Sequence, residues 1–361
     1  MALIKLGIRN FRNLREVDLE PAEDLNLITG QNASGKTSLL EAIYYLGRAS
    51  SFRTSRFDKI VQKGEKELSV YAQQILKNGQ KVRFGLKKGA KTVQIRINEQ
   101  KINKVSDLVY NLPLQVIHPN SHQLLEEGPK FRRRFLDWGV FHVEQSFYPV
   151  WHRYQTALKQ RNTALRQSST KRLIQVWDHE LIESGQILNS KRQVYIEELQ
   201  ALVHEYIKPV LGEMPLKLSY LSGWSKDFSF EQALKQSLQT DIERGFTGVG
   251  PQRADISIQV DGVMANDRIS RGQQKVLVTC LLLAQAGLYN QKTDKKCILL
   301  IDDVAAELDP DNRMRLLNVL QGMNVQMFIT SIEKQTIMPM LEHAKDPRLF
   351  HVEHGNISEV V

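Results

Sequence analysis

The sequence predicts an α/β fold: a mixed sheet with an antiparallel β subdomain and an inserted helical arm subdomain. Three observations lead to this prediction. A complete G-x-x-x-x-G-K-[ST] loop occupies residues 30–37, the first 120 residues are rich in strands, and a helical stretch then separates them from a returning α/β pattern. At 361 residues, the chain is long enough for two domains or for one nucleotide-binding domain with a large insertion.

The glycine-rich loop follows the apolar run at 25–29 and precedes a helix-like segment at 38–43, which is the setting that a phosphate-binding (Walker A) loop requires. A chance match is therefore the weaker interpretation. We expect the loop N–H groups and the helix N-terminus to bind phosphates, Lys36 to reach the β and γ phosphates of ATP, and Thr37 to bind Mg²⁺. The expected nucleotide-binding set is Gly30, Gln31, Asn32, Ala33, Ser34, Gly35, Lys36, Thr37 and Ser38.

Strand patterns dominate the first third of the chain. Turn-forming residues at 77–80 and 88–90 separate consecutive runs, which predicts antiparallel hairpins beside the sheet that follows the glycine-rich loop. The expected strands are 2–8, 16–20, 25–29, 68–76, 81–87, 92–98 and 115–118.

A helical stretch follows from residue 121 to about 211. Apolar residues at Trp151, Tyr154, Leu158 and Leu165 keep helical spacing. A polar break at 167–170 predicts a chain reversal, after which a helix from about 171 to 207 would return until Pro209 stops it. Imperfect heptads leave two arrangements open, a protruding coiled coil or an ordinary helical subdomain packed against the sheet.

Strands return at 216–221 and 255–260, and an α/β pattern closes the chain. Helix 272–288 leads to strand 297–301, helix 311–320 leads to strand 325–330, and short strands are expected near 349–352 and 357–361. We therefore expect three segments: an N-terminal part of one head at 1–120, a helical insertion at 121–215, and the C-terminal part of the same head at 216–361.

Asp302 and Asp303 directly follow the buried strand pattern at 298–301, which is the form of a Walker B motif. A surface carboxylate at the end of a core strand is the alternative, and the intact Walker A loop makes it less attractive. We expect Asp302 to hold Mg²⁺ and Asp303 to orient or deprotonate the attacking water, with Asp303 and Lys36 as the catalytic pair.

The segment 269–274 contains S-x-G-Q and resembles the signature of ABC-type ATPases. That resemblance implies an ABC-type P-loop ATPase head in which Ser270, Gly272 and Gln273 contact the γ-phosphate held by a second subunit. The alternative is purely local, with Ser270 as a helix N-cap and Gly272 in a tight turn. Glu307, Leu308 and Asp309 fit the D-loop, which lies at the dimer interface in that superfamily.

The composition is basic and poor in cysteine. A formal net charge of +9 and a pI of about 9.3 favour an anionic partner such as nucleic acid. Cys280 and Cys297 both lie in apolar runs, so we expect buried thiols in a reducing compartment. No stretch has the length and apolarity of a membrane span, so we expect a soluble cytoplasmic protein without a membrane partner.

Motifs along nearly the whole chain resemble the bacterial RecF family of recombination mediators, which is related to SMC-type ATPases. They lie at 10–13, 30–43, 51–53, 128–137, 250–255, 270–273, 301–303 and 308–309. The resemblance implies an ATP-dependent homodimer that binds DNA and acts in DNA replication and at single-strand gaps, with RecR and RecO, to help RecA loading and SOS induction. Candidate DNA contacts are Lys130, Arg132, Arg133 and Arg134, and a lysine-rich hairpin face with Lys77, Lys81, Lys87, Lys88 and Lys91.

Three positions depart from the usual patterns. Gln252 stands where the RecF family usually has His, Thr330 stands near the place of the switch His of transporter ATPases, and Asp303 is one methylene shorter than Glu. The last two predict slow ATP hydrolysis that times dimerisation and DNA residence. The competing interpretations are an ABC ATPase of a transporter or translation factor, a P-loop kinase of a small metabolite, and a structural DNA-binding protein with an inert nucleotide site.

Overall fold

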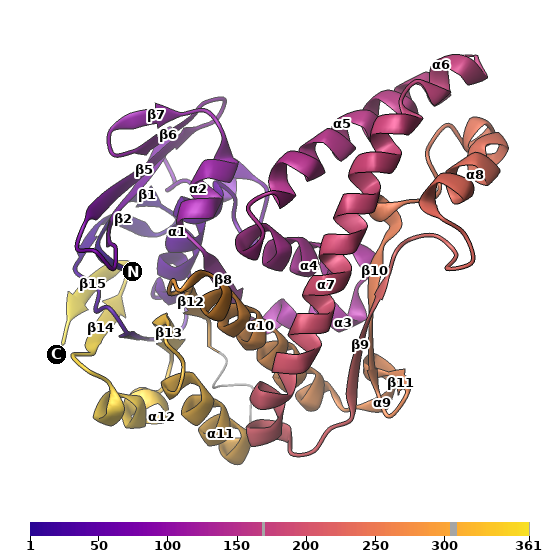
Figure 1. Cartoon of the computed structure of the whole chain (residues 1–361). Coiled ribbons are helices and arrows are strands. Elements are labelled where there is room, and N and C mark those ends of the chain that lie inside the picture. The colour runs from indigo at the N-terminus through magenta and orange to yellow at the C-terminus, as the bar shows by residue number, and fades with distance from the viewer. Residues whose placement is uncertain (168–169, 304–308, 361) are drawn as a thin grey trace. The chain divides into compact units, whose positions relative to one another are not determined.

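The computed structural model describes residues 1–167, 170–303 and 309–360. Two compact units account for the chain (Figure 1). The first comprises residues 1–121 and 279–361, and the second comprises residues 122–278. Helix α10 (Arg271–Thr293) runs through the division between them.

A six-stranded sheet forms the centre of the first unit, in the order β15-β14-β3-β13-β12-β8. All neighbouring pairs are parallel except β14 with β15. The central strands β3, β12 and β13 are buried at every position, as expected for a parallel sheet that is covered on both faces. The strand bounds are Leu25–Thr29 (β3), Leu114–Ile117 (β8), Ile298–Ile301 (β12), Gln326–Ser331 (β13), Arg348–Glu353 (β14) and Asn356–Glu359 (β15).

The predicted hairpins form a second six-stranded sheet, antiparallel throughout, in the order β2-β1-β4-β5-β6-β7. The strands are Ala2–Phe11 (β1), Leu14–Leu19 (β2), Glu67–Ile75 (β4), Lys81–Gly89 (β5), Val93–Ile97 (β6) and Gln100–Ile102 (β7). Neither β7 nor the short helix α2 (Val105–Asn111) that follows it was predicted from the sequence. Both are too short to show a clear period.

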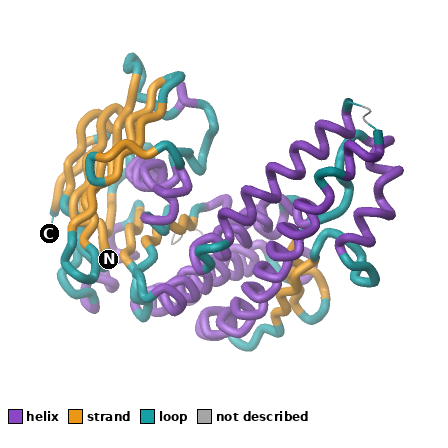
Figure 2. The backbone as a smooth tube through the Cα atoms, turned by 45° about the horizontal axis from the view of Figure 1, so that its top comes forward, coloured by secondary structure: helices purple, strands orange, loops and turns teal. Residues whose placement is uncertain are grey.

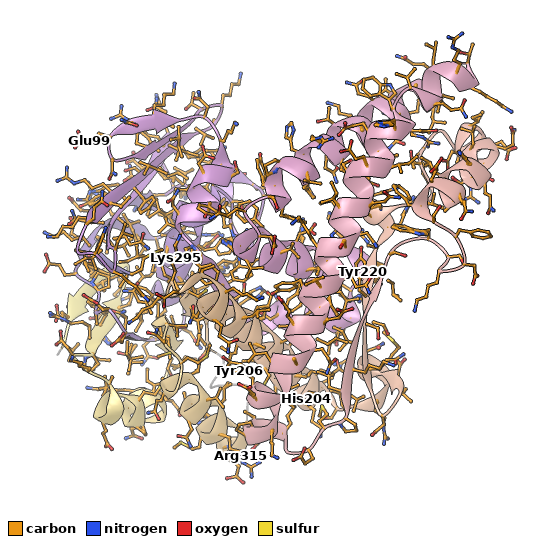
Figure 3. All side chains as sticks on the ribbon, viewed as in Figure 1. Glu99, His204, Tyr206, Tyr220, Lys295 and Arg315 are labelled. Carbon is orange, nitrogen blue, oxygen red and sulfur yellow. The ribbon has the colours of Figure 1, made fainter. Side chains whose placement is uncertain are left out.

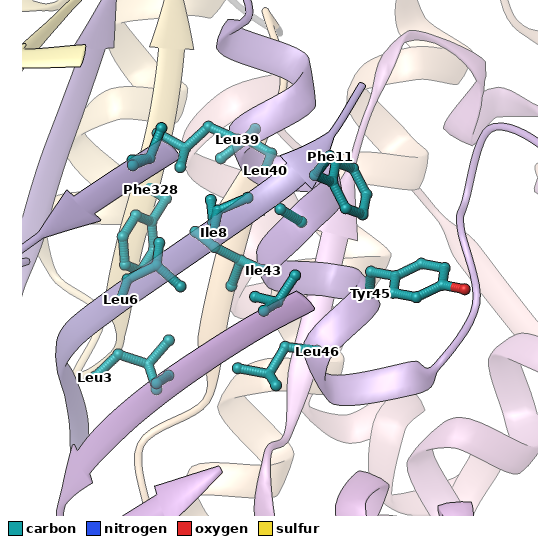
Figure 4. Close-up of a cluster of buried hydrophobic side chains, with 14 of the residues drawn as sticks. Leu3, Leu6, Ile8, Phe11, Leu39, Leu40, Ile43, Tyr45, Leu46 and Phe328 are labelled. Carbon is teal, nitrogen blue, oxygen red and sulfur yellow. The ribbon is translucent and has the colours of Figure 1, made fainter. Parts of the chain in front are cut away.

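Helix α1 (Lys36–Arg48) packs between the two sheets of the first unit. Its apolar residues at 39, 40, 43 and 46 recur at helical spacing and bury one side of the helix. They meet Leu6 and Ile8 of the antiparallel sheet and Phe328 of the parallel sheet in one hydrophobic cluster (Figure 4). This packing holds the N-terminus of α1, and with it the glycine-rich loop, at the end of β3.

Helix α11 (Pro310–Gln321), which lies between β12 and β13 in the chain, and the short α12 (Lys334–Ile337) also belong to the first unit. The predicted alternation of helix and parallel strand in the last third of the chain is therefore confirmed.

The second unit is built around two long helices, α5 (Phe147–Arg166) and α7 (Asp178–Leu211), which lie side by side (Figures 1 and 2). Arg153 bonds Glu180 and Glu183, and Arg161 bonds Asp178, so the helices run antiparallel. The second unit also contains α3 (Gln123–Glu126), α4 (Pro129–Val143), α6 (Lys171–Gln175), β9 (Leu216–Leu221), α8 (Phe230–Arg244), the 3-10 helix Pro251–Arg253, β10 (Asp255–Val260), β11 (Val263–Met264), α9 (Ala265–Arg268) and the start of α10.

Two expectations for this unit were wrong, and one helix was missed. The returning helix is two helices, α6 and α7, and it does not stop at Pro209 but continues to Leu211. A proline this close to the end removes only one of the last turn's hydrogen bonds, so the helix tolerates it. Helix α8 was missed, although Ser229 and Gln232 form a capping box and Gly245 ends the helix with a φ of 72°.

The division of the chain also differs from the expected boundary at residue 215. Strands β9, β10 and β11 form a three-stranded antiparallel sheet that belongs to the second unit. The Gln200 amide on α7 donates to Leu216 O and accepts from Leu218 N–H, so it occupies the edge of β9 like a partner strand. The segment 216–278 therefore groups with the helices and not with the head.

In the described part of the chain, no helix is both long and apolar enough to cross a membrane.

Candidate nucleotide-binding site

The glycine-rich loop joins β3 to α1 with backbone angles that favour glycine. Gly30 has φ 149° and Gly35 has φ 126°. A Cβ on Gly30 would lie 2.3 Å from Val352 O, so the loop also needs glycine there to pass close to β14. Ser34 and Gly35 are buried, and residues 31–33 are exposed. The loop therefore presents an exposed rim above a buried floor.

Lys36 is folded back onto this loop. Its ammonium donates to Gly30 O at 2.7 Å and to Gln31 O at 2.9 Å, and only 7% of the residue is exposed. Burial lowers the pKa of Lys36, while the Asp303 and Asp302 carboxylates raise it. An ammonium has three donors, so a third remains for a phosphate oxygen.

Thr37 and Asp302 meet across α1 and β12. Thr37 Oγ1 donates to the Asp302 carboxylate, at 2.9 Å from Oδ1 and 3.1 Å from Oδ2. Thr330 Oγ1, at the end of the neighbouring strand β13, donates to Asp302 Oδ1 at 2.9 Å. Burial raises the pKa of Asp302, and the hydrogen bonds from the two threonines oppose that rise. The structure thus brings the two predicted metal ligands together.

Asp303 follows directly and turns the chain with φ 49°, a conformation that Asp tolerates better than most residues. Its N–H donates to Thr330 Oγ1 at 3.0 Å. Thr330 therefore bonds both carboxylate residues, one through the side chain and one through the backbone.

Two clusters that support this loop were not predicted as site residues. Asn13, in the turn between β1 and β2, donates to Ser34 O at 3.0 Å and accepts from Ser38 Oγ at 2.8 Å. The Gly355 N–H donates to the same Ser34 O at 2.8 Å. The loop and the start of α1 are therefore tied to the antiparallel sheet and to the β14–β15 turn.

The second cluster surrounds the fully buried Glu41 on α1. Arg12 binds its carboxylate in bidentate fashion at 2.8 and 2.6 Å, and Arg53 lies 3.4 Å from it. The hydroxyl of Ser51 also donates to Glu41. Arg12 and Arg53 belong to two of the motifs that carry the family resemblance. Their structural role is to bind the buried Glu41 carboxylate of α1.

The residues present fit a magnesium nucleotide. Ser34 Oγ is buried and has no hydrogen-bond partner among the described residues, so the loop holds a polar atom ready for an incoming oxygen. Thr37 and Asp302 offer a hydroxyl and a carboxylate, the hard oxygen ligands that Mg²⁺ prefers. The raised pKa of the Asp302 carboxyl is the consequence of burying a charge that a cation would neutralise.

The signature segment opens α10, as predicted. Gln273 N–H donates to Ser270 Oγ at 3.3 Å, and Ser270 N–H donates to Gln273 Oε1 at 3.1 Å, which is a capping box. Of the purely local alternative, the N-cap at Ser270 is confirmed, and the tight turn at Gly272 is wrong, because Gly272 lies in the first turn of the helix. A Cβ there would meet nothing within 4 Å, and residues 270–273 are exposed. Of the expected D-loop, Glu307 and Leu308 lie outside the described residues, and Asp309 is the N-cap of α11.

The candidate DNA-binding residues on α4 divide into two kinds. Arg132 binds Asp255 at 2.7 and 3.0 Å, and Arg133 donates to Ala254 O at 2.8 Å, so both are engaged within the second unit. Lys130 and Arg134 are exposed. Among the hairpin lysines, Lys77 is paired with Asp294 and Lys87 with Glu67, while Lys81, Lys88 and Lys91 carry no ion pair with a described residue.

Gln252 has a structural place in the second unit. Its amide donates to Thr247 O and Val249 O at 3.2 and 2.8 Å, and the hydroxyl of Tyr154 donates to its Oε1. A glutamine can make all three bonds at once because its side chain carries two donors and an acceptor. The residue therefore anchors the segment 247–252 to α5.

The fold and the site together define a P-loop ATPase of the ABC type. Residues 2–357 match the family described as "RecF/RecN/SMC N terminal domain". The chain is 40% identical to the DNA replication and repair protein RecF of Shewanella oneidensis over 361 residues, which covers 100% of both chains. It is 39% identical to the protein of the same name from Vibrio atlanticus, with 99% of this chain and 100% of the relative covered. The chain belongs to the RecF family.

Solved structures agree with this assignment. The structure of the recombination mediator protein RecF with ATP, in the RecFOR pathway, superposes with a TM-score of 0.88 at 26% identity, covering 100% of this chain and 98% of that one. An Smc head domain from Pyrococcus furiosus shares the fold, with a TM-score of 0.57 at 14% identity, covering 99% of this chain and 96% of that one. The predicted ABC-type head with mixed sheets and a helical insertion is thus confirmed.

Proposed function

We propose that this protein is an ATP-dependent DNA-binding recombination mediator that acts in DNA replication and repair, with ATP as a switch for dimerisation. The observation that carries the proposal is the assembly of Thr37, Asp302 and Thr330 beneath a complete phosphate-binding loop. Relatives that match the chain end to end are named as DNA replication and repair proteins, which supports the same conclusion.

The residues of this site would hold Mg·ATP. Thr37 and Asp302 would hold Mg²⁺, which when bound neutralises phosphate charge. Lys36 and the N–H groups of residues 30–38 would bind the phosphates. Asp303 would hold the attacking water. Its short side chain, and a threonine instead of a titratable histidine at 330, support slow hydrolysis.

The exposed signature supports a homodimer. Ser270, Gly272 and Gln273 lie at the exposed N-terminus of a 23-residue helix, where the helix dipole favours an anion. In the proposed dimer, this end of each protomer contacts the γ-phosphate bound by the other. The capping box keeps the helix end formed before the partner arrives.

The partners in the proposal are DNA at single-strand gaps, RecR and RecO, with RecA loading and SOS induction downstream. The ATP-bound structural neighbour is described as part of the RecFOR pathway, which supports RecR and RecO as partners. The net charge of +9 supports binding to the DNA backbone rather than to a base sequence. Lys130 and Arg134 remain the better candidates on α4, since Arg132 and Arg133 are engaged in contacts within the protein.

The test measures oligomer mass by analytical ultracentrifugation and DNA retention by fluorescence anisotropy, with and without Mg·ATP. We expect Lys36→Ala to lose nucleotide-dependent dimerisation, Ser270→Arg to bind ATP but remain monomeric, and Asp303→Asn to dimerise and persist. Ser190→Arg is the matched control for Ser270→Arg, because Ser190 is also an exposed serine of the second unit and lies on α7. If wild type and all variants give the same mass and the same DNA retention, the proposed switch is wrong.

A further inference from the structure

The outer face of the antiparallel sheet carries an aromatic and cationic row that the ATPase site does not use. Cross-strand register places Gly7 opposite Tyr71, Tyr71 opposite Gly85, Gly85 opposite Arg96, and Arg96 opposite Lys101. Residues directly opposite each other share a face of the sheet. The other face carries the buried side chains that pack on α1, so this row, which we term the outer row, faces solvent.

Tyr71 is an exposed aromatic side chain that is held in one position. Its ring lies over Gly7, where a Cβ would come within 1.9 Å of the ring. Its hydroxyl donates to Asp18, which is itself held by Arg9 at 2.7 Å. The residue is nevertheless 44% exposed. The hydroxyl bond to Asp18 and the contact with Gly7 therefore hold the ring in one position on the sheet. The rest of its surface is exposed and could contact a planar ligand.

Gly85 leaves a gap beside that ring. A Cβ on Gly85 would meet nothing within 4 Å, although its two neighbours in the outer row are Tyr71 and Arg96. Strands are about 4.8 Å apart, so the side chains on β4 and β6 rise about 10 Å from each other over a floor of bare backbone. Tyr71 on β4 and Arg96 on β6 therefore flank a strand position that carries no side chain.

The charge on this face increases toward the β7 edge. Arg83 is paired at 2.9 Å with Glu99, which lies in the turn between β6 and β7 and is labelled in Figure 3. Lys87 is paired with Glu67 at 2.6 Å. Lys81, Arg96 and Lys101 are exposed and make no ion pair with the described residues. Arg96 and Lys101 continue the row from Gly85 across β6 and β7, and Lys81 lies four residues before Gly85 on β5, so this face carries three cations without an acidic partner among the described residues.

We propose that the outer row binds single-stranded nucleic acid, with a base stacked on Tyr71 over Gly85 and the adjoining phosphates on Arg96 and Lys101. The inference rests on the proposed function, because it names the surface and the strand type for DNA binding. Aromatic stacking and backbone charge are the two interactions that proteins combine for unpaired strands. A duplex keeps its base faces stacked inside and offers none to Tyr71.

The test compares the binding of a fluorescein-labelled oligodeoxythymidine and of a duplex of the same length, in Mg·ATP, for wild type and four variants. Gly85→Val fills the gap with a residue that strands favour, and Tyr71→Leu removes the ring, while Tyr71→Phe retains it. Arg96→Glu/Lys101→Glu reverses the charge. Lys334→Glu/Lys345→Glu is the matched control, since both lysines are exposed in the same unit and unpaired among the described residues.

We expect Gly85→Val and Tyr71→Leu to weaken single-strand binding about tenfold and duplex binding less than about twofold, with Tyr71→Phe close to wild type. The charge reversal should weaken single-strand binding more, and should reduce the slope of log affinity against log salt by about 1.4, for two lost phosphate contacts. Light-induced crosslinking of an iodouracil-substituted strand should label Tyr71.

Two results would overturn the inference. One is single-strand affinity within twofold of wild type in the Gly85, Tyr71 and charge-reversal variants, which would leave this face to a protein partner. The other is an equal loss for duplex and single strand in the Gly85 and Tyr71 variants, which would remove the role of the ring. If the wild type retains no DNA in Mg·ATP, the proposed DNA-binding function is wrong as well. If the wild type retains DNA and the variants bind single strands as it does, only the assignment of this surface is wrong.

Discussion

The hydroxyl of Thr330 donates to Asp302 Oδ1 at 2.9 Å and accepts from the backbone N–H of Asp303 at 3.0 Å. One side chain at the end of β13 therefore orients the carboxylate expected to hold Mg²⁺ and the backbone of the residue expected to hold water. A threonine can make both bonds because a hydroxyl is a donor and an acceptor at once. Thr330 does not titrate near neutral pH, so its contribution is geometric.

Thr330→Val tests this geometry. The change keeps the shape but leaves a buried carboxylate with one donor fewer and a backbone N–H without its acceptor, so we expect the free energy of unfolding to fall by about 1 to 3 kcal/mol. Nucleotide affinity in Mg²⁺ should fall more than affinity in EDTA. Urea denaturation and calorimetric titration measure the two effects. Thr330→Ser retains the hydroxyl and should stay near wild type, and equal behaviour of the Val and Ser variants would argue against the role.

Lys36→Ala should weaken ATP binding about ten- to a hundredfold. The reason is that the variant loses charge-assisted hydrogen bonds to phosphate and the two bonds that order residues 30 and 31. Titration with a fluorescent ATP analogue measures this loss. Lys63→Ala is the control, since Lys63 is an exposed lysine of the same unit, and it should bind like wild type. An affinity for Lys36→Ala within twofold of the control would contradict the assignment.

Arg192→Leu should destabilise the protein by about 3 kcal/mol. Arg192 is 3% exposed, binds the Asp137 carboxylate at 2.9 and 3.0 Å, and donates to Pro251 O at 2.8 Å. Its removal leaves a desolvated carboxylate alone, and burial already raises the pKa of Asp137.

Two comparisons make the Arg192 result specific. Arg153→Leu, which breaks an exposed bidentate pair with Glu180, should cost less than about 1 kcal/mol. Asp137→Leu/Arg192→Leu should recover part of the loss, because no charge is then left buried without its partner. Chemical denaturation of the four proteins gives the energies, and equal losses for Arg192→Leu and Arg153→Leu would show that burial plays no part.

The two cysteines should be unreactive in the folded protein. Both are fully buried, and burial raises the pKa of Cys280 and of Cys297 to about 12. Because the thiolate is the reactive species, a thiol reagent at pH 8 should find no fast-reacting group in the native state and two in denaturant. The reaction rate should begin to rise only well above pH 10. A fast thiol at pH 8 under native conditions would mean that one of the two apolar segments opens.

The fold was predictable where short segments carry their own pattern. The buried strand at 25–29, the loop at 30–37 and the hairpins of the first third are contiguous, so their periods and turn residues are visible in the sequence. Helix α8 could also have been predicted, because the residues of its capping box and its terminal glycine are visible in the sequence. The boundary at residue 215 failed for another reason: β9 belongs to the second unit through its pairing with β10 and the contact with Gln200.

The same distinction between local motifs and tertiary contacts holds for the residues of the candidate site. Lys36, Thr37 and Asp302 were identifiable because their motifs are local. The support from Asn13 and Glu41 was not, since it depends on which strands and turns lie beside the loop. Arg132 and Arg133 looked like DNA-binding residues because a run of positive charge does not show which side chains turn inward to a carboxylate or a carbonyl.

By itself, the sequence determined the class of the protein: a phosphate-binding loop, a carboxylate-tipped strand and a serine-capped helix, each encoded within a few consecutive residues. Only the tertiary structure decided that Thr330 joins Asp302 to Asp303, that Asn13 holds the loop, and that Tyr71 lies over Gly7 beside the open backbone of Gly85. The physical reason is that these contacts depend on strand order and register. Both follow from burial and backbone pairing summed over the whole sheet, and no single segment contains that information.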